Sequence, residues 1–139
     1  MKVRMWTASL ILLLLAAQAV QGAAAVERTF NAPVDRVWIA TEAVLKHLGW
    51  DVDKADRSIG FITTDSRRVD GDNYGVYENA LRHRLRLTVK AAGDSRTVVS
   101  VERSVFKRER ILFVDKDEPV NDNSQNVEKA VLDAIGKAL

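Results

Sequence analysis

Arg82, Arg84 and Arg86 occupy alternate positions in one stretch of this 139-residue chain. Successive side chains of a β-strand point to opposite faces, so a strand here would hold three guanidinium groups in a row on one face. Such a row predicts a surface that attracts anionic groups. A second basic run on the next predicted strand comprises Arg103, Lys107, Arg108 and Arg110. We assign Arg103 to the same binding surface.

The alternative to this binding surface is a solvated sheet face without a partner. Carboxylates on the neighbouring strand, such as Glu102 and Glu109, would then neutralise the arginines. The binding interpretation instead implies anionic lipid headgroups, a glycan or an acidic protein as partner. Two tyrosines in the flexible loop around segment 70–75 could add contacts to that partner. The expected partner-binding residues are therefore Tyr74, Tyr77, Arg82, Arg84, Arg86 and Arg103.

Residues suited to catalysis or metal binding are few. His47 and His83 are the two histidines, they lie in different predicted elements, and the chain has no cysteine. Segment 70–75 has the composition of a calcium loop, but Tyr74 and Leu81 stand at the fifth and twelfth loop positions, where calcium needs oxygen ligands. The sequence also contains no nucleophile elbow and no phosphate-binding glycine loop. We expect no catalytic residue, no metal and no cofactor.

Residues 1–25 have the order of a secretory signal peptide. Lys2 and Arg4 come first, an apolar run from Leu10 to Ala17 follows, and small residues extend to Ala25. The apolar run is shorter than the roughly 20 residues that span a bilayer. We expect export to the periplasm with cleavage near the end of this segment, a retained membrane anchor being the alternative. We expect no lipidation, because no cysteine follows the segment.

The charge balance of residues 26–139 argues against nucleic acid as a partner. Two of the 21 Lys and Arg residues precede Val26 and all 19 acidic residues follow it, so this part of the chain carries equal numbers of basic and acidic residues. The basic isoelectric point therefore comes largely from the signal segment. At this length, residues 26–139 are expected to form a single domain.

Hydrophobic periodicity predicts the elements that must position these residues. Helices are predicted over Val34–Leu48, ended by Gly49, and over Val127–Ala138; strands over Val26–Phe30, Trp50–Asp56, Gly60–Thr64, Leu81–Ala91 and Thr97–Arg110. Segments 70–75 and 115–122 are predicted as polar loops, and Trp38 and Trp50 as core residues. The expected fold is an α+β two-layer domain: an antiparallel sheet of about five strands, with an early helix and a long C-terminal helix packed on one face.

The turn around Gly93 and Asp94 decides the register of the two longest strands. A loop that contains Gly93, Asp94 and Ser95 pairs Leu87 with Val101 and sets Arg86 beside Glu102. A two-residue turn would instead place polar residues on the buried face. Because a one-residue slip moves every side chain to the other face, burial favours the first register.

Three stretches of the first half carry a resemblance to a known family: Arg28–Trp38, Leu48–Val52 and Ala55–Ile62. They resemble the BamC-like helix-grip domains of bacterial envelope proteins, and small exported proteins of unassigned function. BamC-like proteins differ in having a lipid anchor on a cysteine and two such domains. A looser resemblance runs to START-like helix-grip proteins, which hold apolar ligands between helix and sheet.

The resemblance and the residues together lead to two functional expectations. The first is a periplasmic binding or envelope-assembly accessory protein, without catalysis, that contacts an envelope protein or another anionic envelope component. The second is a carrier of a small apolar ligand or lipid, held between the C-terminal helix and the sheet. The sequence fixes neither the partner nor the oligomeric state.

Overall fold

The computed structural model describes residues 24–139, so residues 1–23 of the predicted signal peptide lie outside the described part. The elements in chain order are β1 (Val26–Phe30), α1 (Val34–His47), β2 (Val52–Asp56), β3 (Phe61–Thr64), β4 (Arg67–Asn73), β5 (Glu78–Ala91), β6 (Thr97–Ile111), β7 (Val114–Pro119) and α2 (Asn126–Ala138). Neither α1 nor α2, the helices of this described part, has the length and hydropathy of a membrane-crossing helix.

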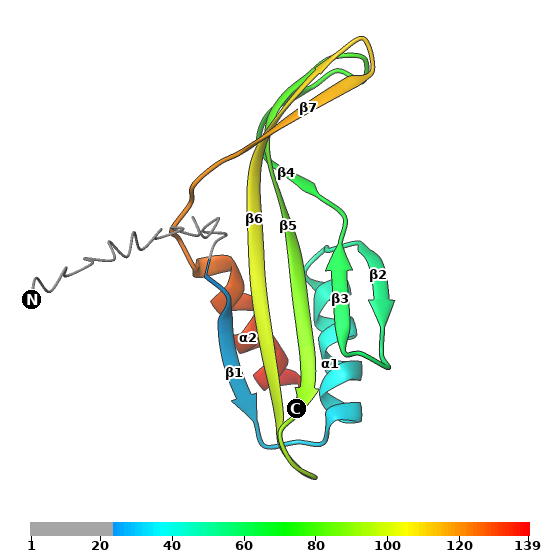
Figure 1. Ribbon diagram of the computed structural model, residues 1–139, viewed down its shortest axis with the longest axis vertical. Helices are drawn as coiled ribbons and strands as arrows, with labels where there is room; N and C mark the ends of the chain where they lie inside the picture. The colour runs from blue at the N-terminus through cyan, green and yellow to red at the C-terminus, as the bar shows by residue number, and fades with distance from the viewer. Residues whose placement is uncertain (1–23) are drawn as a thin grey trace, which may run out of the picture.

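One antiparallel sheet of seven strands organises the fold (Figure 1). Its central order is β1-β6-β5-β3-β2, while β4 pairs with β5 and β7 pairs with β6. Strands β5 and β6 extend well beyond the helices, and β4 and β7 pair with the projecting part. We call this projection the arm: β4, β7 and the segments 78–83 and 106–111 that pair with them. The remainder is the body.

The predicted α+β class and the predicted register are confirmed. Leu87 pairs with Val101 and Arg86 with Glu102, in a ladder that runs without a bulge along the whole of β5. The loop between the strands contains Gly93 and is closed by a hydrogen bond from the Ala92 N–H to the Arg96 carbonyl oxygen. Burial of one sheet face therefore selected the register, as expected.

The predicted count of about five strands matches only the central path of the seven-stranded sheet, because two stretches predicted as polar loops lie largely in strands. Most of segment 70–75 belongs to β4, and most of segment 115–122 belongs to β7. Every residue of β7 is exposed, and so are six of the seven residues of β4. Neither strand has a buried face, so neither shows the alternation of apolar and polar residues from which strands are recognised.

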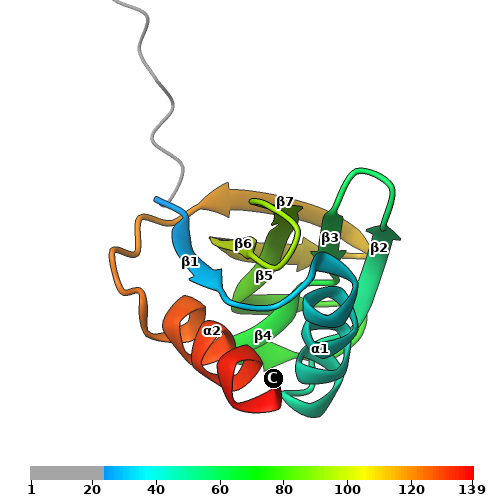
Figure 2. The same ribbon diagram turned by 90° about the horizontal axis from the view of Figure 1, so that it is seen from below.

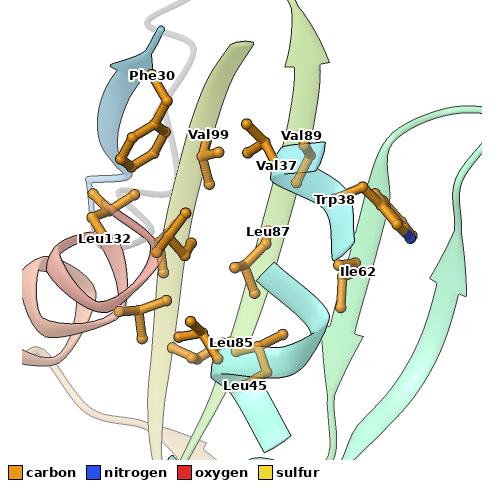
Figure 3. Close-up of a cluster of buried hydrophobic side chains, with 14 of the residues drawn as sticks. Phe30, Val37, Trp38, Leu45, Ile62, Leu85, Leu87, Val89, Val99 and Leu132 are labelled. Atoms are coloured by element: carbon orange, nitrogen blue, oxygen red, sulfur yellow. The ribbon is translucent and has the colours of Figure 1, made fainter. Parts of the chain in front are cut away.

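Both helices cover a single face of the body sheet, as predicted (Figure 2). Figure 3 shows the core between them, in which Leu45 from α1 and Leu132 from α2 belong to one cluster with Leu85, Leu87 and Val99 of the sheet. These five residues are fully buried. The C-terminal helix has 13 residues and α1 has 14, so the expected long C-terminal helix is in fact the shorter one. Gly49 follows α1 with φ +80°, the left-handed conformation predicted for the residue that ends this helix.

The two neighbours Trp38 and Ile39 on α1 give a matched test of the core. Trp38 is 4% exposed, whereas Ile39 is 60% exposed. We expect Trp38→Ala to lower the free energy of unfolding by about 3–5 kcal/mol, because it empties an aromatic site in the core. Ile39→Ala should change it by about 0.5 kcal/mol or less. Denaturant unfolding measures both, and equal effects would contradict the orientation of α1.

Candidate functional site

The sheet face opposite the helices, here called the outer face, carries Arg84 and Arg86. Both side chains are exposed, and no hydrogen bond or ion pair holds either of them within residues 24–139. The Arg84 guanidinium lies 4.9 Å from the ring centre of Phe106, and that of Arg86 lies 5.9 Å from the ring centre of Phe61. A guanidinium above an aromatic ring keeps its N–H groups free to donate to an incoming oxygen.

Arg82 shares this face but is already occupied. Its Nε donates to Ser66 Oγ at 3.0 Å and its Nη2 to the Ser66 carbonyl oxygen at 2.9 Å. Its Nη1 lies 2.6 Å from Glu78 Oε1, and the Glu78 side chain is completely buried. Arg82 therefore ties β5 to the chain before β4 and is not available to a partner.

Assigning Arg103 to the binding surface was wrong, because its side chain lies on the opposite face. Arg103 pairs with Leu85 in the ladder, so it points toward the helices and is 5% exposed. Its Nε donates to Glu128 Oε1 on α2 at 2.7 Å. Its Nη2 donates to Asp122 Oδ2 at 3.0 Å and to the Ser124 carbonyl oxygen at 2.9 Å. Arg103 follows Val99 and Val101 at two-residue intervals, and this spacing could have predicted that it lies on the buried face.

Two further outer-face arginines, both on β6, are neutralised by β7. Arg108 donates to both carboxylate oxygens of Asp117, at 2.7 and 2.8 Å. Arg110 donates in the same way to Asp115, at 2.5 and 3.1 Å. These hydrogen bonds hold the pKa of each carboxyl below its ordinary value. Of the expected arginine surface, Arg84 and Arg86 alone keep free guanidinium groups.

Tyr74 and Tyr77 lie far from this pair, at the end of the arm. They are 75% and 51% exposed, and they flank a shallow groove of about 330 Å³ that Arg110 and Ile111 also line. The turn that joins β6 to β7 lies beside them, since the Phe113 N–H donates to the Val76 carbonyl oxygen. The sequence did not reveal this turn, because the run from Ile111 to Val114 is apolar and contains none of the Gly, Pro, Asn or Asp residues that mark turns.

A cluster of Trp50, His83 and Arg67 lies where the arm meets the body. The imidazole and the indole contact each other at a tilt of 42°, with 4.6 Å between the ring centres, and the Arg67 guanidinium lies 3.8 Å from the centre of the indole. His83 Nε2 accepts a hydrogen bond from Arg67 Nε at 3.2 Å. Burial, and then the nearby charges of Arg67 and Arg103, lower the pKa of His83 to about 4.

Residues 24–139 contain no group of three or more potential ligands that could hold a metal ion.

Comparison with known proteins identifies no family for this chain. No family model and no curated protein matches it. A TBP-like protein from Parabacteroides distasonis is similar in structure, with a TM-score of 0.45 and 14% sequence identity over 80% of this chain and 91% of that chain. A DUF4468 family protein from Bacteroides ovatus gives a TM-score of 0.39 and 10% identity over 86% and 82%. Similarities this distant assign no function.

The buried pair of Arg103 and Glu128 should be essential to the docking of α2. Arg103→Met leaves the Glu128 carboxylate buried without a cation, so we expect a loss of about 3–5 kcal/mol in the free energy of unfolding. The double variant Arg103→Met/Glu128→Leu should recover most of that loss, because it removes both charges. Urea unfolding of both variants measures the effect. A single variant as stable as the original chain would contradict the role of the pair.

His83 should make the fold less stable as the pH falls. Its pKa is about 4 in the folded chain and about 6.5 in an unfolded one, so the unfolded state binds more protons between these values. The free energy of unfolding should therefore be highest above pH ~6.5 and decrease toward pH ~4, by at most about 1.4 kcal/mol per pH unit. His83→Gln keeps an acceptor for Arg67 and should flatten this dependence, measured by denaturant unfolding. His47→Gln, on the exposed face of α1, is the control and should leave the dependence intact.

Proposed function

We propose that this protein is an exported binding protein of the cell envelope, which captures an acidic, extended segment of a partner protein on its outer face. Arg84 and Arg86 are the proposed contacts. The observation that carries the proposal is that both guanidinium groups are exposed and lie over aromatic rings, and that neither forms an ion pair within the described chain, even though Glu102 is the ladder partner of Arg86.

The spacing of the two arginines favours an extended segment over a single anion. Alternate residues of a strand lie about 7 Å apart, and alternate carboxylates of an extended peptide have the same spacing. The protein contains an example of this match, since Asp115 and Asp117 on β7 engage Arg110 and Arg108. The proposed partner segment would make the same carboxylate–guanidinium contacts from above the outer face, because β5 is an inner strand with β6 on one side and β3 and β4 on the other.

The finer features of the proposal come from the sequence. They are a periplasmic location after signal-peptide cleavage, a helix-grip domain of the BamC-like kind, and a role in contact with envelope proteins without catalysis. The uncovered outer face supports a role in contacts, because a charged surface with free donors has more to gain from a partner than from water alone.

The alternative role as an apolar-ligand carrier has no observation in its favour. Such a ligand would lie between α2 and the sheet, where Val131, Leu132 and Ile135 face Val99 and Val101. All five side chains are at most 1% exposed and belong to one packed core. Because these side chains already pack against one another, the interface between α2 and the sheet has a structural role.

The test is a titration with a synthetic peptide in which Asp alternates with Thr. We expect measurable binding that weakens with added salt, because the contacts are charge–charge. Arg84→Glu/Arg86→Glu should abolish it while changing the free energy of unfolding by about 0.5 kcal/mol or less, since both side chains are exposed. Calorimetry and denaturant unfolding provide the two readouts.

The matched control is Arg96→Glu/Lys129→Glu. It makes the same net charge change at two exposed positions away from the outer face, in the loop between β5 and β6 and on α2, and should leave peptide binding unaltered. If the control and Arg84→Glu/Arg86→Glu lose peptide binding equally, the binding depends on net charge and not on the outer face. Binding to phosphatidylglycerol vesicles without binding to the peptide would replace the protein partner by a lipid surface.

A further inference from the structure

The end of the arm gathers large apolar side chains that the fold leaves in water. We call them the apolar tip; its members are Tyr74, Tyr77, Ile111, Leu112, Phe113 and Val114. Each is between 51% and 75% exposed, whereas the other exposed large apolar residues of the described chain are scattered over separate elements. Single exposed apolar residues are ordinary, but a contiguous patch indicates an interaction site.

The backbone conformation of the tip is unfavourable for the residues that adopt it. Ile111 pairs with Val114, and the two residues between them, Leu112 and Phe113, have φ angles of 50° and 66°. Left-handed φ at both central positions fits a type I′ turn, where Asn-Gly is the favoured pair. Leucine and phenylalanine rarely adopt positive φ, so the local backbone does not favour either residue at these positions. Non-glycine residues in this conformation concentrate at functional sites.

The tip is held in shape by the neighbouring turn. The Phe113 N–H donates to the Val76 carbonyl oxygen at 3.2 Å, and Arg110 Nη1 donates to the Gly75 carbonyl oxygen at 3.2 Å. The Tyr74 N–H donates to the Tyr77 carbonyl oxygen at 2.8 Å. The β4–β5 and β6–β7 turns therefore form one rigid end, which lies at the extremity of the long axis of the molecule (Figure 1).

The side chains become more polar from the end of the arm toward the body. Segments 73–77 and 111–114 contain no charged residue. The two tyrosines belong to these segments, and a tyrosine has an apolar ring with a polar hydroxyl that suits a membrane–water boundary. Charged residues begin directly behind them: Asp72, Glu78, Glu109, Arg110, Asp115 and Lys116.

We propose that the apolar tip inserts end-on into the surface of a lipid bilayer. Leu112 and Phe113 would enter the acyl region, and Tyr74 and Tyr77 would lie at headgroup level. The charged residues behind the tip are four acidic and two basic, so they do not attract anionic lipid. The proposed target is therefore a zwitterionic bilayer, bound through apolar insertion. This site is separate from Arg84 and Arg86 and goes beyond the proposed function.

The decisive variant is Leu112→Asn/Phe113→Gly. It installs the pair that a type I′ turn favours, so the arm should fold at least as well as before. It also removes both apex side chains, so binding to phosphatidylcholine vesicles should fall at least tenfold. The assay is co-sedimentation of the chain from Ala24 onward, which contains all nine elements and the core and omits the apolar N-terminal run.

Ile59→Ser is the control, because Ile59 is 61% exposed in the turn between β2 and β3, which belongs to the body and lies away from the arm (Figure 1). It should leave vesicle binding unchanged. Added salt should also leave binding unchanged, and phosphatidylglycerol in the vesicles should not strengthen it.

Three outcomes would overturn the proposal: no binding of the original chain, equal binding by the Leu112→Asn/Phe113→Gly variant, or binding only to anionic vesicles. Self-association that the same variant abolishes, in the absence of vesicle binding, would assign the tip to a second copy of the chain. Peptide binding at Arg84 and Arg86 should persist in this variant, so the two proposals can fail independently.

Discussion

The unbroken pairing of β5 with β6 is the constraint on which the rest of the structure depends. Fourteen consecutive residue pairs join the strands, and no bulge interrupts them. A slip by one residue would exchange the faces of the whole ladder. Because Leu87 and Val101 must face the helices, Arg86 must face outward, and the same parity carries Arg108 and Arg110 onto the outer face of the arm. One burial requirement in the body thus places charges far along the arm.

Body and arm share this ladder but are stabilised by different interactions. The body buries aliphatic side chains between two helices and one sheet face. The arm lacks a covering helix and relies on backbone pairing with β4 and β7 and on ion pairs across its outer face. At the centre, the buried Glu78 carboxylate lies between Arg82 at 2.6 Å and Arg110 at 3.5 Å. Burying one carboxylate between two guanidinium groups offsets its desolvation.

The parts of this fold that could be predicted are those with a buried face. Alternation in β5 and helical periodicity in α1 gave the elements, the register and the core position of Trp38. Strands β4 and β7 gave no such signal, because all but one of their residues are exposed. Arg103 was misplaced for the opposite reason: its charge suggested solvent, whereas its parity placed it in the core. Its acidic partner Glu128 is 25 residues away, so the sequence did not connect them.

The sequence agrees with the fold almost everywhere, and two of its local conflicts lie in and beside the arm. One is the turn at Leu112 and Phe113, where two large apolar residues adopt positive φ angles that such residues disfavour. The other is the joint with the body, where Trp50 Nε1 and His83 Nδ1 are buried without hydrogen-bond partners. Unpaired buried polar atoms cost free energy. The two conflicts thus lie at the two ends of the arm, the unpaired atoms at its base and the strained turn at its tip, whereas the unbroken β5–β6 ladder between them satisfies both the backbone and the pattern of burial.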